Sequence, residues 1–165
     1  MFDLILRNGT VVTPHGVSEQ DVAVSGEIIS AITAPNIIGA DQVTKSIDAT
    51  GKIVMPGGID PHVHCKWIMP MPDGSVGYTD GPEIVSRAAL FGGTTTMIDF
   101  AARIEDIPFK DIIKKRDQDW DNNCYCDYSY HLMLLGDVEP PVLSEIEQLI
   151  ADGYPTIKIF TTNIT

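Results

Sequence analysis

The chain has 165 residues, of which 44% are hydrophobic, enough to bury the core of one ordinary domain. Its formal net charge is −12, so a phosphate backbone would be repelled and nucleic acid is excluded as a favoured partner. No stretch approaches the roughly 18 apolar residues of a membrane span, and a secretory signal is not expected, because residues 1–4 begin neither a basic nor a long apolar stretch. With three cysteines, an odd number, free thiols and a cytoplasmic location are expected.

Residues 1–55 are expected to form short strands of a small sheet, part of a β-sandwich. Apolar runs at 4–6 and 10–12 flank Asn8-Gly9. An Asn-Gly pair between such runs is typical of a β-hairpin, because both residues tolerate positive φ. Further strands are predicted at 21–24, 28–32 and 52–55.

After Pro56, apolar runs alternate with helical stretches. Strands are predicted at 59–64, 94–100, 125–135 and 156–160, and helices from Pro82 to Gly92, at 107–120 and at 140–151. A loop marked by prolines and glycines, within residues 65–80, follows the first of these strands.

This alternation predicts an α/β fold with a parallel sheet covered by helices, either an open doubly wound sheet or a barrel. A (β/α)8 barrel spends roughly 31 residues on each βα unit, so residues 56–165 would hold about four units. We therefore expect the first half of a barrel, with the chain ending near its middle.

The sharpest motif is His62-Val63-His64, at the end of the first predicted barrel strand. Residues i and i+2 of a strand face the same side, so both imidazoles are expected to project together. Neutral imidazole is a common ligand of zinc-like ions. The pair alone is a weak signal, because two polar residues in a loop would give the same pattern.

The surrounding residues make the motif more specific. Residues 54–64 resemble the signature of the amidohydrolase superfamily, and three later segments resemble barrel strands two to four of its dihydropyrimidinase, hydantoinase and allantoinase branch, at 92–100, 127–131 and 153–160. The resemblance implies an N-terminal part of such an enzyme, in which residues 1–55 join C-terminal strands to complete the sandwich. It also implies a small cyclic amide as substrate and a homodimer or homotetramer.

The resemblance further implies two divalent metal ions. His62 and His64 would bind one of them, and Lys158, carboxylated on its side-chain nitrogen, would bridge both. Zinc suits such ligands best, with manganese or cobalt as substitutes. A lysine within the apolar run 157–160 is costly to bury without a charged partner, although an ordinary ion pair is the alternative role. Two more histidines and the Asp that acts as general base are expected beyond Thr165, so this chain alone is predicted to be inactive.

Several other residues are candidates for the same site. Trp67 and Met69 could form a hydrophobic wall for a substrate, or pack within their own loop. Asn163 stands where hydantoin-opening relatives usually carry a tyrosine, five residues after the lysine, and could still donate a hydrogen bond. Asp99 is expected to contact His62 or His64, to cap the end of its strand, or to form a salt bridge. His131 is expected to be a hydrogen-bonded core histidine or to face the metals.

The implied reaction is hydrolysis of the C–N bond of a hydantoin- or dihydropyrimidine-like ring by a hydroxide activated between two metals. Two alternatives stay open. One is a non-catalytic scaffold protein related to dihydropyrimidinase, and the other is a related ring hydrolase such as allantoinase or dihydroorotase. A thiolate zinc site of Cys65, Cys124 and Cys126 is disfavoured, because no Cys-x-x-Cys pair is present.

Overall fold

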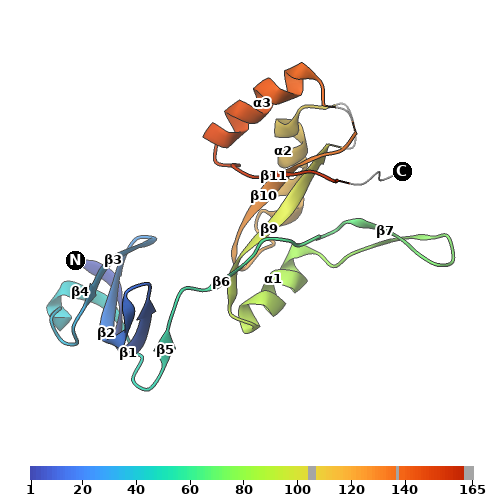
Figure 1. Cartoon of the computed structure of the whole chain (residues 1–165). Helices are drawn as coiled ribbons and strands as arrows, with labels where there is room; N and C mark the ends of the chain where they lie inside the picture. The colour runs from blue at the N-terminus through green and yellow to red at the C-terminus, as the bar shows by residue number, and fades with distance from the viewer. Residues whose placement is uncertain (104–106, 137, 162–165) are drawn as a thin grey trace. The chain divides into compact units, whose positions relative to one another are not determined.

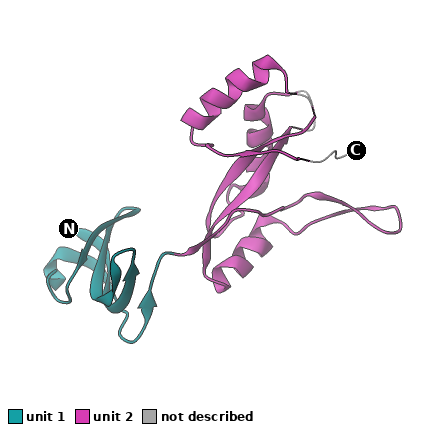
Figure 2. Cartoon of the chain, viewed as in Figure 1, with its two compact units in different colours: residues 1–56 teal, residues 57–165 magenta. Residues whose placement is uncertain are grey.

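The computed structural model describes residues 1–103, 107–136 and 138–161 and divides into two compact units, 1–56 and 57–165 (Figure 1, Figure 2). The first unit is a five-stranded sheet of order β3-β2-β1-β4, with β5 also pairing with β1. Its elements are β1 Phe2–Thr13, β2 Gly16–Ser25, β3 Ile28–Thr33, the short helix η1 Ala40–Gln42, β4 Val43–Asp48 and β5 Ile53–Val54. Its small core contains Ile5, Ala23 and Ile38.

The expected hairpin at Asn8-Gly9 is wrong. Strand β1 runs through both residues with a β-bulge, in which Asn8 has φ 58°, and the chain turns instead between Thr13 and Gly16. The buried carboxylate of Asp21 explains the bulge, because it accepts the backbone N–H of Asn8 at 2.8 Å. Gly9 lets β5 approach, since a Cβ there would lie 2.6 Å from a methyl carbon of Val54.

The second unit contains a four-stranded parallel sheet of order β11-β10-β9-β6, the α/β half-barrel arrangement expected from the sequence. Its strands are β6 Gly58–Asp60, β9 Thr94–Arg103, β10 Asp127–Leu134 and β11 Ile157–Lys158, and its helices are α1 Pro82–Phe91, α2 Phe109–Trp120 and α3 Pro140–Ala151. Within the described residues, no helix is long and apolar enough to span a membrane.

One face of this sheet packs against helices. Met97, Ala101, Tyr130 and Leu132 point from β9 and β10 into a core completed mainly by α2 and α3, with Phe109, Ile112, Trp120, Val142 and Ile146. Because side chains alternate along a strand, the residues between them point to the opposite face of the sheet. That second face carries Phe100 and His131, which pair in register across β9 and β10.

The predicted loop after the first strand contains an antiparallel hairpin, β7 Ile68–Pro70 and β8 Val76–Tyr78, which projects from the rest of its unit (Figure 1). Its tip is a tight turn, in which Gly74 has φ 82° and the Asp73 carboxylate accepts the N–H and hydroxyl of Ser75. The prolines and glycines that predicted a loop therefore shape the ends of a hairpin.

Candidate metal centre

His62 and His64 lie just beyond the end of β6, not within the strand as predicted. Pro61 has no N–H to donate, so the regular ladder ends at Asp60, whose carboxylate instead accepts the N–H of His62 at 3.1 Å. One bond from the N–H of Val63 to the carbonyl of Ile98, 3.1 Å, still holds the segment beside β9. The two imidazole centroids consequently lie 5.2 Å apart.

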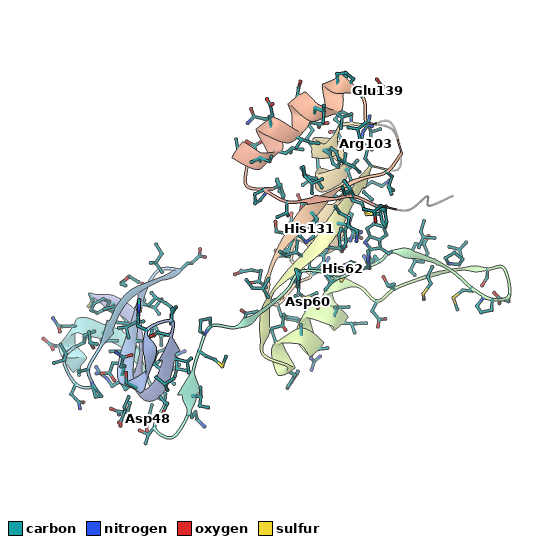
Figure 3. All side chains as sticks on the ribbon, viewed as in Figure 1. Asp48, Asp60, His62, Arg103, His131 and Glu139 are labelled. Atoms are coloured by element: carbon teal, nitrogen blue, oxygen red, sulfur yellow. The ribbon has the colours of Figure 1, made fainter. Side chains whose placement is uncertain are left out.

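Both imidazoles pack on one buried ring, Phe100 of β9. Its centroid lies 4.8 Å from that of His62 and 4.8 Å from that of His64, which stacks on it at 18°. His131 of β10 lies 5.3 Å away on the same ring, and the Nζ of Lys158 lies 5.7 Å from its centroid. Three separate chain segments thus converge on Phe100, and Figure 3 shows His62 and His131 in this region.

Sequence reasoning did not select Phe100 as a site residue. The sequence did contain a signal for Phe100. Asp99 was expected at the end of this strand, and because successive side chains of a strand point to opposite faces, its neighbour Phe100 had to face the other side of the sheet. Only the register of β9 with β10, which places Phe100 opposite His131, shows that it is central.

Lys158 is half-buried at the edge strand β11. Its ammonium lies over two aromatic rings, 5.7 Å from the centroid of Phe100 and 5.1 Å from that of Phe160. Among the described residues, no acidic side chain lies within salt-bridge distance of it. The ordinary ion pair considered for this lysine is thus not formed within the described part of the chain.

The burial of His64 favours its neutral form. Burial lowers its pKa most, Asp99 acts in the opposite direction, and the nearby His62, Lys158 and Arg116 lower it further. A neutral imidazole is the form that can donate a lone pair to a metal ion. The net environment therefore suits His64 to coordination.

Asp99 is fully buried behind the histidines and holds the segment that follows them. Its carboxylate accepts the backbone N–H of Cys65 at 3.2 Å, the indole N–H of Trp67 at 2.8 Å and a guanidinium N–H of Arg116 at 2.5 Å. Arg116, from α2, also donates to the carbonyl of Cys65 at 2.8 Å. Of the roles expected for Asp99, the structure therefore contains the salt bridge, and its effect on His64 is electrostatic.

His131 uses both ring nitrogens in hydrogen bonds. Nε2 lies 2.8 Å from the carbonyl of Pro61, which can only accept, so Nε2 carries the proton. Nδ1 lies 2.6 Å from the hydroxyl of Thr156. His131 thus links β10 to the segments that lead into His62 and Lys158, which matches the hydrogen-bonded role among its two expected ones.

The remaining candidates lie at the edge of this cluster or outside it. Trp67 packs edge-on against His64, with ring centroids 4.7 Å apart, whereas Met69 pairs with Gly77 in the hairpin and is 45% exposed. Asn163 lies outside the described residues.

The three cysteines gather in one place without forming a metal site. Cys65 is buried, Cys124 and Cys126 pack against the same core, and the two latter sulfur atoms lie 3.8 Å apart. Burial is the main cause that raises the pKa of both Cys65 and Cys126 to about 12. Among the described residues, no group of three or more His, Cys, Asp and Glu side chains is arranged to hold a metal ion.

Known proteins were compared with this sequence and fold, and no family model matches. The D-hydantoinase of Streptomyces coelicolor is 34% identical over 94% of the chain and 33% of its own length, and the dihydropyrimidinase of Arabidopsis thaliana is 35% identical over 95% of the chain and 28% of its own length. The solved D-hydantoinase of a Bacillus sp. AR9 superposes with a TM-score of 0.80 at 34% identity, covering 98% of this chain and 34% of that one.

This chain matches the N-terminal third of the hydantoinases and dihydropyrimidinases. The resemblance expected from its signature motifs is therefore confirmed in sequence and in fold. The chain spans about a third of the length of the hydantoinases that it matches. Its four parallel strands correspond to part of their barrel, and the His62, His64 and Lys158 cluster lies on the face of this hydantoinase-like sheet opposite to the helix-packed core.

Proposed function

We propose that this chain supplies part of the active site of a metal-dependent hydrolase of cyclic amides, acting on hydantoin- or dihydropyrimidine-like rings. The observation that carries the proposal is the convergence of His62, His64 and Lys158 on Phe100. These residues come from opposite edges of the parallel sheet, so their meeting reflects the fold and not merely their order in sequence. The similarity to hydantoinases and dihydropyrimidinases gives the substrate class.

The donor set fits part of a divalent metal site. Two imidazoles with centroids 5.2 Å apart leave room for one ion, and burial lowers the pKa of His64, which favours its neutral form. Zinc is the ion best suited to imidazole combined with anionic oxygen ligands. His62 and His64 would hold it, and Phe100 would support both rings from behind.

Lys158 fits the site only in a modified form. An ammonium repels a cation, and its lack of an acidic partner among the described residues leaves its charge uncompensated. After loss of a proton, the Lys158 amine can attack carbon dioxide to form a C–N bond, and release of a second proton leaves a carbamate anion. This anion offers two oxygens and so would link two metal ions.

Each residue around the ligands then has a distinct role. Metal ions, when bound, would supply an activated hydroxide and polarise the ring carbonyl. His131 holds the segments leading into His62 and Lys158 by its two hydrogen bonds. Asp99 and Arg116 fix the peptide groups of Cys65, and hence the position of His64.

His62, His64 and Lys158 are too few to complete a two-metal site, and relatives of this chain are about three times its length. We therefore expect the 165-residue chain by itself to open neither hydantoin nor dihydrouracil. The further histidine ligands and the Asp expected as general base would have to come from other residues. A measurable ring-opening rate from this chain would contradict that expectation.

Metal binding by the chain tests the proposal directly. Equilibrium dialysis against zinc or cobalt should show an ion bound by the unaltered chain, and His62→Ala and His64→Ala should each abolish it. His15→Ala is the matched control, because His15 lies in the turn of the first unit.

Carbon-13 NMR in labelled bicarbonate should show a carbamate signal that Lys158→Arg removes. Metal retention by the double variant His62→Ala, His64→Ala would overturn the proposal.

A further inference from the structure

A cavity of about 370 Å³ lies beside the metal-ligand cluster, between the base of the β7–β8 hairpin and helix α2. Its walls include the rings of Trp67, Tyr78 and Phe100 and the aliphatic side chain of Ile112. This volume lies within the range of small-molecule sites, which are largely apolar with a few polar groups. The cavity could therefore accept an apolar body the size of a benzene ring with a short substituent.

The charged groups of this cavity do not balance. Lys66 lies 2.9 Å from the Asp119 carboxylate, and Arg116 is paired with Asp99 and with Asp119 at 3.4 Å. Lys115 also lines the cavity, and among the described residues no acid lies within salt-bridge distance of it. Among the described residues, the three cations of the lining thus stand against two carboxylates, that of Asp119 in the lining and that of Asp99, which pairs with Arg116.

This surplus of positive charge among the described residues of the cavity contrasts with the formal net charge of the chain, −12. A positive cavity in an acidic molecule concentrates anions locally and repels cations. An apolar wall next to an unpaired ammonium suits a molecule that joins a hydrocarbon body to a carboxylate. It does not suit a neutral ligand or an amine equally well.

We propose that the cavity between the β7–β8 hairpin and α2 binds small organic carboxylates, with the apolar body against Trp67, Tyr78 and Phe100 and the carboxylate against Lys115. Binding of this kind needs no metal ion. Since Trp67 and Phe100 also contact the histidines, the cavity adjoins the candidate metal centre. A ring substrate whose substituent ends in a carboxylate would place that substituent here, a step that rests on the proposed function.

Three probes of matched size and different charge test the proposal on the 165-residue chain: phenylacetate, phenylacetamide and phenethylamine. NMR can follow the indole N–H of Trp67, which is bonded to Asp99, while the indole of the fully buried Trp120 serves as an internal reference. Phenylacetate is expected to bind about fivefold or more tightly than phenylacetamide, because a charged hydrogen bond is stronger than a neutral one. The amine should bind most weakly.

Two variants separate the roles of charge and cavity. Lys115→Gln should remove the preference for phenylacetate, whereas Lys114→Gln, the same change on the same helix but outside the cavity lining, should retain it. Ala102→Leu, which fills space in the lining, should weaken both phenylacetate and phenylacetamide. The charge preference should also shrink as salt is added.

The proposal would be overturned by a wild-type chain that binds none of the probes, by a preference that survives Lys115→Gln, or by a preference for the amine. These outcomes are independent of zinc or cobalt binding by His62 and His64. A chain that binds phenylacetate but no metal would support the cavity and contradict the proposed function, and the reverse result would do the opposite.

Discussion

Arg116 of α2 and Asp99 of β9 form a buried ion pair whose two members also bond the N–H and the carbonyl of one residue, Cys65. The pair thereby ties the helix layer to the segment that carries His64. Asp99 is fully buried and the side chain of Arg116 is 14% exposed, so neither charge is well solvated. Breaking such a pair leaves a charge without compensation.

Asp99→Asn should therefore destabilise the second unit by about 3 kcal/mol or more, since it leaves the largely buried Arg116 guanidinium with only its longer, partly exposed contact to Asp119. Urea denaturation followed by circular dichroism measures the change. Asp119→Asn is the comparison, because its pairs with Lys66 and, at 3.4 Å, with Arg116 are both partly exposed and are each worth about 1 kcal/mol or less. An equal loss of unfolding free energy in the two variants would show that the buried pair stabilises the fold no more than the partly exposed ones.

His131 gives a second prediction, because its side chain bridges the segments before His62 and before Lys158. His131→Phe keeps a ring against Phe100 but removes both hydrogen bonds, so we expect a loss of about 1–3 kcal/mol. Thr156→Val removes only the Nδ1 bond and should cost about half as much. Hydrogen exchange of the β10 and β11 amides measures the local opening, and unchanged protection in His131→Phe would contradict this role.

The N-terminal unit shows why local signals misplace turns. Asn8-Gly9 tolerates positive φ in a bulge as readily as in a hairpin, and the deciding contact comes from Asp21, which is distant in sequence. The same limit applies at β6, where alternation correctly predicted converging imidazoles but Pro61 ended the strand early. By contrast, helix α3 begins and ends where its flanking residues predicted, since its Pro-Pro start and Asp-Gly end are local.

Substitutions at the bulge should distinguish the two arrangements. Asn8→Gly keeps the positive φ at no steric cost and should be close to neutral, whereas Asn8→Val should cost about 1–2 kcal/mol. Gly9→Ala should also destabilise, because the added carbon would lie 2.6 Å from a methyl carbon of Val54. Thermal unfolding of each variant gives the comparison. A well-tolerated Gly9→Ala would show that β5 does not pack as closely as described.

The candidate site could be predicted only where residues near in sequence define it. The His62 and His64 pair and Lys158 could be predicted from sequence motifs. Phe100, the ring that all three contact, could not, because its position in a strand becomes significant only through the register of β9 with β10. The ion pair of Asp99 and Arg116 joins residues that are 17 positions apart, on β9 and α2, and the sequence spacing of these two residues does not predict it. Tertiary packing supplied both features.

The metal-free chain should show an unusually acidic His64. Burial is the largest cause that lowers its pKa from 6.5; Asp99 opposes it, and His62, Lys158 and Arg116 add to it. Between the lowered value and 6.5, the unfolded chain binds more protons at this residue than the folded chain does. The contribution of His64 to stability is therefore present above that window and is lost as pH falls through the lowered pKa. NMR titration with chelator present measures the shift from 6.5. His64→Gln should remove the corresponding acid-dependent loss of stability, and a His64 that titrates at or above 6.5 would contradict the environment described around it.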